Sequence, residues 1–189
     1  MKHLFLLSFI VALITSCDSD KFSEKEKQVY IVKGKEIGKA TLKKLGSNLM
    51  YHIKTGGTKE AIPFCNVKAD ILTTEIADKY KVSIKRTSHK IRSKKNKPNQ
   101  EEEAIIKHYL SLVTKGEKLK PIVKKEKDNK VHFYAPIIAE GKCLMCHGVV
   151  GEQITSKTDS ILKVLYPNDK ATGFKVGNLR GVLAVTFNE

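Results

Sequence analysis

Apolar residues recur every three or four positions in the first third of the chain, at Leu42, Leu45, Leu49 and Ile53. This spacing puts them on one face of a helix, so we expect a long amphipathic helix over residues 23–52. Gly56-Gly57 follows and is expected to end it. The N-terminal third of the domain is therefore predicted to begin with a long helix.

A second apolar stripe follows the two glycines and steps by four, four, three and four residues: Ala61, Cys65, Ala69, Leu72 and Ile76. These side chains share one helical face, which puts Cys65 on the buried side of a second helix. Pro63 fits such a helix only in its first turn or at a kink.

The remaining patterns alternate between strand and helix periods. Five elements are expected: a strand over 82–86, a helix from Pro98 or Asn99 to Gly116, a hairpin of 122–127 and 130–138 around Asp128-Asn129, a helix over 154–165, and a strand over 181–187. This order predicts an α+β fold in which helices flank a small antiparallel sheet.

The N-terminus has the pattern of an export signal. Lys2 and His3 precede an apolar run over 4–14, which ends in Leu13-Ile14-Thr15-Ser16-Cys17. Eleven apolar residues are too few to span a bilayer, and this ending resembles the bacterial lipoprotein signal. We expect a signal peptide over 1–16, a lipid on Cys17, a tether over 17–28 and one domain over 29–189. An ordinary signal peptide beside a free cysteine is the alternative.

The chain is strongly basic, with 35 Lys and Arg against 20 Asp and Glu among 189 residues and a net charge of +15. Eight basic and no acidic residues fall between 81 and 100. Such charge often indicates nucleic-acid binding, but an exported protein does not share a compartment with nucleic acid. An extracytoplasmic, membrane-anchored chain would instead turn this surface toward anionic head groups, cell-wall polymers or an acidic redox partner.

Cys143-Leu144-Met145-Cys146-His147 is the attachment pattern of c-type haem. The two thiols would form thioethers with one haem, and the adjoining imidazole of His147 would become the proximal iron ligand. A redox-active dithiol would place the motif at a strand-to-helix junction, whereas here it follows a hairpin. Zinc would need a fourth ligand at a suitable spacing, and the sequence offers none.

The second iron ligand is less determined by sequence. The candidates are Met50, His52, His89, His108, His132 and Cys65. His or Met would be favoured by frequency, with His89 in reserve. Because Cys17, Cys143 and Cys146 already have expected roles, Cys65 is an odd thiol in an oxidising compartment. The alternative is that Cys65 is simply a small buried apolar residue.

Several segments, in this order, resemble a known family: 61–65, 84–92, 134–137, 143–148, 166–174 and 177–181. Together they are similar to the Tll-type family of single-haem c-type cytochromes, a former domain-of-unknown-function family with a PAS-like fold. The resemblance runs from about residue 35 to the end. It implies one covalent haem c with His147 and Cys65 as axial ligands; Pro63 departs from the family pattern.

Basic and aromatic residues near these motifs are further candidates for haem contacts. Arg86 and Arg92, with Lys90 as a weaker candidate, are expected to pair with the haem propionates, since a guanidinium binds a carboxylate bidentately. A solvated basic loop is the alternative. Arg180 would pair with a propionate or with Asp169, and Tyr134 is expected to pack on the haem or in the sheet.

The attachment motif and the export signal together predict a haem protein outside the cytoplasm. Enzyme activity is not expected, because the sequence has no hydrolytic or phosphate-binding motif. A thiolate ligand favours ferric iron, which suits extracytoplasmic electron transfer or redox sensing. The alternative is a haem-based gas sensor whose distal Cys65 dissociates to admit a ligand.

Overall fold

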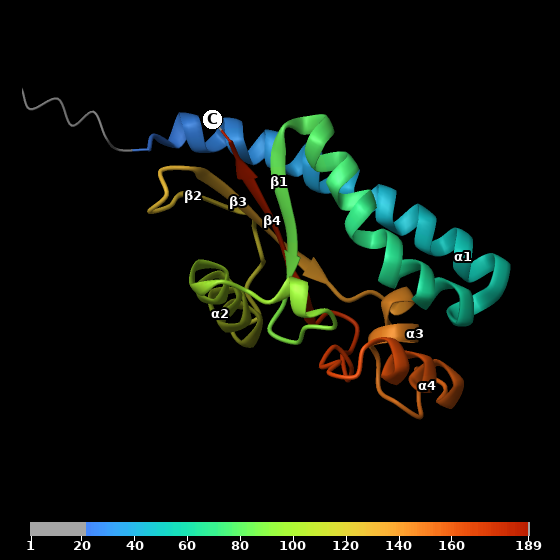
Figure 1. The fold of residues 1–189 in the computed structure, drawn as a ribbon. Helices are drawn as coiled ribbons and strands as arrows, with labels where there is room; N and C mark the ends of the chain where they lie inside the picture. Colours follow the sequence, from blue (N-terminus) through green and yellow to red (C-terminus); the bar gives the residue numbers. More distant parts are fainter. Residues whose placement is uncertain (1–21, 189) are drawn as a thin grey trace, which may run out of the picture.

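The computed structural model describes residues 22–188, so the predicted signal peptide and Cys17 lie outside the described residues. The fold is α+β, as the sequence predicts, with a long N-terminal helix and a four-stranded antiparallel sheet. Figure 1 shows the sheet between the long helix α1 and the shorter α2, with α3 and α4 beside the far end of α1. No helix within 22–188 is long and apolar enough to cross a membrane.

Helix α1 (Glu24–Tyr80) is two helices joined at a sharp break. Gly57 has φ 65° and ψ −159°, a conformation that favours glycine, so the expected end of the first helix is confirmed. The two arms run antiparallel (Figure 1). The ion pair between Lys44 Nζ and Glu75 Oε2, 3.0 Å apart, joins them. The hairpin brings the second arm, which carries Cys65, back toward the sheet.

The start of each arm of α1 differs in detail from the sequence prediction. Ser23 caps the helix in a capping box with Glu26, so residues 24–28, which composition suggested as tether, are already helical. In the second arm, Pro63 lies in the second turn after Gly57 and not in the first. The helix continues through it.

The sheet has the order β1-β4-β3-β2 with every neighbouring pair antiparallel. Its strands are β1 (Val82–Thr87), β2 (Ile122–Lys125), β3 (Val131–Ile138) and β4 (Leu179–Phe187). Asn129, with φ 61°, turns the chain between β2 and β3, which confirms the predicted hairpin. The C-terminal strand β4 therefore lies in the centre of the sheet.

The two faces of the sheet are buried under different helices. Phe133 of β3 packs with Ile37 of α1, whereas its neighbour Tyr134 packs with Tyr109 of α2 (Gln100–Thr114). Adjacent strand residues point to opposite faces, so β3 contributes to both cores. Gly34 lets α1 approach closely, since a Cβ there would lie 2.2 Å from the Phe133 ring.

The end of the molecule beyond the sheet consists of short elements. Two 3-10 turns, Lys94–Asn96 and Gly141–Cys143, accompany α3 (Leu144–His147) and α4 (Ser156–Leu165). α4 packs on α1, and the hydroxyls of Thr58 and Thr158 hydrogen-bond at 2.7 Å. This end, which we call the motif end, carries the Cys-x-x-Cys-His sequence.

Candidate haem site

The two motif thiols lie on one continuous turn. Cys143 ends its 3-10 turn, α3 begins at the next residue, and Cys146 follows within α3. Cys65, Cys143 and Cys146 are all free thiols with partly buried side chains. Cys146 packs against a small apolar cluster that includes Ile62, one turn before Cys65. The motif is therefore anchored beside the second arm of α1.

His147 is oriented by a backbone carbonyl. Its Nδ1 lies 2.7 Å from the carbonyl oxygen of Ala171, which can only accept, so Nδ1 carries the proton and Nε2 keeps its lone pair. Burial, reinforced by the positive charges of Arg180 and Arg92, holds the pKa of His147 well below its usual value. A neutral imidazole with a free Nε2 is the form that binds iron, and metal-bound histidines commonly make this second hydrogen bond.

The segment after α4 holds this imidazole in place. The N–H of Phe174 donates to the carbonyl of His147 at 2.9 Å, and the N–H of Gly173 donates to the carbonyl of Gly148 at 2.7 Å. The Phe174 ring lies edge-on to the His147 ring, with centroids 6.3 Å apart. The loop 166–174 thus forms the wall behind the candidate proximal ligand.

Cys65 shares an electrostatic neighbourhood with the motif. Burial raises the pKa of the Cys65 thiol, while the positive charges of Arg86 and Arg92 lower it. Burial is the main cause that raises the pKa of Cys146; negative charge on Cys65 raises it further, and Arg92 lowers it. Cys65 therefore lies within electrostatic range of the motif. At Cys65, burial opposes the thiolate form that a metal ligand needs, and the two arginines offset part of that effect.

Arg92 is engaged within the protein. Its Nη2 lies 2.9 Å from Oδ2 of Asp169, and the side chains of this pair are only 13% and 10% exposed. Its guanidinium also donates to the carbonyls of Cys146 and Ala171. Arg92 therefore joins the motif to the 166–174 loop. The sequence suggests Asp169 as a partner of Arg180, whereas the structure pairs it with Arg92.

The other two arginines differ in their partners. Arg86 lies 3.8 Å from Asp70, which also pairs with Lys95 at 3.3 Å. Arg180 forms no ion pair with any carboxylate in residues 22–188; its Nη1 donates to the carbonyl of Lys90 at 3.4 Å. Its charge lies 5.1 Å from the centroid of the Phe174 ring, on the wall behind His147.

Tyr134 is not brought to this cluster. It is buried against α2, on the face of the sheet opposite α1, and its hydroxyl lies 3.4 Å from Glu126. The remaining predicted alternatives are also dispersed: His52 pairs with Glu60, His132 pairs with Asp128, and His108 is exposed on α2. His89 is exposed, with its ring 5.9 Å from that of Phe174.

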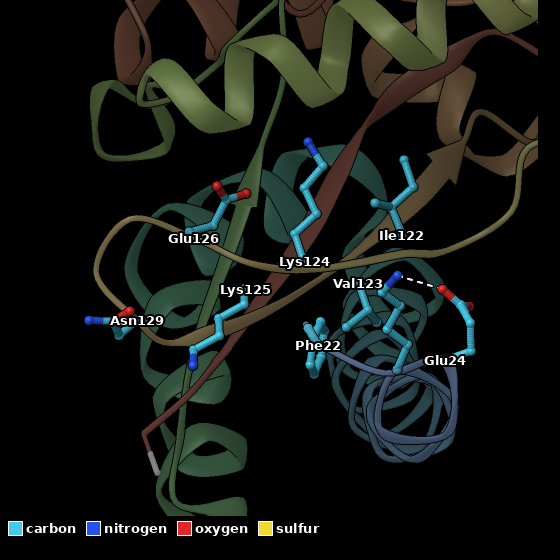
Figure 2. A pocket seen from close by; sticks show the side chains of 9 residues that line it. Phe22, Glu24, Ile122, Val123, Lys124, Lys125, Glu126 and Asn129 are labelled. Atoms are coloured by element: carbon cyan, nitrogen blue, oxygen red, sulfur yellow. Dashed lines mark hydrogen bonds and ion pairs between the residues drawn. The ribbon is translucent and has the colours of Figure 1, made fainter. Parts of the chain in front are cut away.

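A groove at the other end of the described residues offers no second site for a metal. Figure 2 shows a groove of about 980 Å³ between the start of α1 and β2, lined by side chains such as Phe22, Val123 and Lys125. It lies at the end of the sheet away from the motif and holds no Cys or His. Within residues 22–188, no three His, Cys, Asp or Glu side chains gather as a metal-binding group.

The fold and the motif define an α+β chain with a Cys-x-x-Cys-His sequence beside a helical hairpin. Residues 16–188 match the family model of the Tll0287-like proteins, so the chain belongs to the Tll0287-like family. Its fold resembles the crystal structure of the cyanobacterial heme-protein Tll0287, with a TM-score of 0.61 and 23% identity over 87% of this chain and 96% of that one. No curated protein matches.

Proposed function

We propose that this protein is a covalent c-type haem protein outside the cytoplasm. The observation that supports this most directly is the state of His147: its imidazole is partly buried, its pKa is held well below the usual value, and its Nδ1 is fixed by Ala171, which leaves Nε2 for a metal one residue after a free thiol. The family relationship and the likeness to a heme-protein agree with it.

The residues present fit the attachment chemistry of one haem. Cys143 and Cys146 would form the thioethers, and His147 would hold one axial position through Nε2. Cys65 would supply the other axial ligand as a thiolate. When bound, the iron would supply reversible one-electron chemistry. The role of the chain is to fix the ligand set and exclude water from it.

Cys65 as the distal ligand suggests a low-potential site for electron transfer or redox sensing. A soft anionic thiolate stabilises ferric over ferrous iron. Burial raises the pKa of the Cys65 thiol, and the nearby positive charges of Arg86 and Arg92 offset part of this effect in favour of the ionised sulfur. His147 and Cys65 together would hold the iron in the oxidised protein.

Gas sensing through loss of the Cys65 ligand is the second candidate. Burial raises the pKa of the Cys65 thiol, so protonation would weaken its hold on the iron and open that position to a gas. Carbon monoxide added to the reduced protein separates the two functions: rapid carbonyl formation supports sensing, and an unchanged spectrum supports electron transfer.

The proposal includes a lipid on Cys17 and an acidic redox partner. The first arm of α1, roughly 33 residues, is about 50 Å long at 1.5 Å per residue. It would hold the motif end away from the membrane in which the lipid is anchored. The exposed lysines at 94, 95 and 97 lie near the motif end and would suit an acidic protein surface.

The mass of the mature protein tests haem attachment. When the chain is produced in a host with cytochrome c maturation, we expect the mass of one covalent haem, lost in Cys143→Ala/Cys146→Ala. An unmodified wild-type mass contradicts the proposal.

Cys65→Ala should convert the low-spin ferric spectrum to high spin, with His89→Ala as the matched control. A spectrum that changes only in the control would assign the ligand to His89.

A further inference from the structure

The guanidinium of Arg180 lacks a counter-charge at a position where the protein has withdrawn it from water. Its only hydrogen bond within the described residues is the 3.4 Å contact from Nη1 to the carbonyl of Lys90. Burial, together with the positive charges of Arg92 and Arg86, lowers the pKa of Arg180 to about 10, and the negative charge of Asp169, which is itself paired with Arg92, offsets only part of this effect. A partly buried cation without an anion destabilises a protein, so such groups are normally paired.

The nearby carboxylates are already engaged with other cations. Asp169 is held by Arg92 at 2.9 Å, and Asp70 is shared by Arg86 and Lys95. The motif end therefore contains more buried positive than negative charge. An external anion would correct this imbalance.

A second cation, Lys90, contacts the same aromatic ring as Arg180. Lys90 Nζ and the Arg180 guanidinium each lie 5.1 Å from the centroid of the Phe174 ring. The same ring packs edge-on against the imidazole of His147. Lys90 Nζ donates to the carbonyl of Thr172 at 3.1 Å, a contact that leaves two of its three protons for a ligand. The two cations thus lie on the wall that supports the proximal histidine.

We propose that Arg180 and Lys90 form a binding site for the two propionate carboxylates of the haem attached at Cys143 and Cys146. This inference rests on the proposed function. It replaces Arg86 and Arg92 as the expected partners of the propionates, because both already have carboxylate partners. A guanidinium presents two parallel N–H donors to a carboxylate, whereas an ammonium binds it as a point charge. Arg180 is therefore expected to contribute more than Lys90.

The reduction potential of the holoprotein, measured as a function of pH, provides the test. A propionate paired with Arg180 stays ionised to low pH, so the pH-dependent step in the potential should lie well below pH 7. Arg180→Gln should move this step upward by about one pH unit or more, a tenfold change in proton affinity. Lys90→Gln should move it less. Lys94→Gln removes the same charge from an exposed site and is the matched control.

A common background substitution and a second Arg180 variant complete the experiment. His89 also faces Phe174, so all variants are compared in a His89→Ala background, which removes its titration. If Arg180→Gln does not fold, Arg180→Lys keeps the charge but loses the bidentate geometry, and a smaller upward shift is expected. The proposal is overturned if the shift in the Arg180 variants equals that of Lys94→Gln. Absence of covalent haem in the wild type would instead refute the proposed function.

Discussion

The sheet end and the motif end of this molecule are stabilised in different ways. At the sheet end, two apolar clusters cover the two faces of one sheet, and long elements supply them. At the motif end, α3 has four residues and the apolar clusters are small. There the chain is held by hydrogen bonds from side chains to backbone carbonyls, such as those of Arg92 and His147.

This difference matters for function. A sheet end that buries most of its apolar area can fold around its own core. The motif end joins distant segments through polar contacts, such as Arg92 with Asp169 and Ser88 with Arg180, which are 77 and 92 residues apart. Because these contacts surround free thiols and an unpaired guanidinium, we expect the motif end to gain stability from a bound cofactor, whereas the sheet end should not.

The largest expected effect is at the sheet end. Phe133 is fully buried, and Phe133→Ala should lower the free energy of unfolding by about 3–5 kcal/mol through lost burial and the cavity left behind. The haem spectrum of the remaining folded protein should be unchanged. Urea unfolding and the visible spectrum measure the two effects. Val164→Ala, at a 78% exposed position, is the control and should change stability by less than about 0.5 kcal/mol. An altered spectrum in Phe133→Ala would show that the two ends are coupled.

At the motif end, Asp169→Asn should cost about 3 kcal/mol, because it leaves the largely buried Arg92 without its ion-pair partner. Here the spectrum should change as well, since Arg92 also binds the carbonyl of Cys146. The same two measurements apply. Glu75→Gln breaks an ion pair that is half exposed on α1 and should cost about 0–1 kcal/mol. Equal losses in the two variants would contradict a structural role for the Arg92 pair.

The sequence predicts the sheet end well because its elements are specified locally. Periodicity identifies both arms of α1, and Asn99 caps α2 in a box with Glu102 just as the three glutamates of its first turn indicate. The β2–β3 turn follows from Asp128-Asn129 in the same way. Each of these signals depends on residues within a few positions of one another.

The motif end is predictable in its chemistry and not in its contacts. The Cys-x-x-Cys-His spacing predicts covalent haem attachment, and the sequence also predicts Cys65 as a ligand; both stay predictions, although Cys65 lies within electrostatic range of Cys146. The partner of Arg92 could not be read from the sequence, because Asp169 lies 77 residues away and the pairing depends on the tertiary fold. Strand alternation alone likewise does not tell which face of β3 lies under α1, and this decides the position of Tyr134.

Two glycines of α1 differ in whether they have room for a side chain. A Cβ at Gly34 would overlap the buried Phe133 ring, so Gly34→Ala should cost about 1–2 kcal/mol after the gain in helix propensity is subtracted. Gly46 has nothing within 4 Å of its Cβ position, and Gly46→Ala should stabilise the protein by up to about 1 kcal/mol. Thermal unfolding of the two variants measures the difference. Shifts of the same sign would contradict the close approach of α1 to the sheet.

Removal of a helix cap should have the smallest effect on stability, and the effect should be the same size at the sheet end and at the motif end. The Asn99 side chain accepts from the N–H of Glu102 at the start of α2, and Thr155 accepts from the N–H of Thr158 at the start of α4. Asn99→Ala and Thr155→Ala should each cost about 1 kcal/mol in unfolding experiments. Only Thr155→Ala should also alter the haem spectrum, because Leu162 of α4 belongs to the cluster that supports Cys146. Asn99→Ser and Thr155→Ser keep a capping oxygen and should restore both properties. If Asn99→Ala alters the spectrum as much as Thr155→Ala does, the two ends do not behave as separate regions.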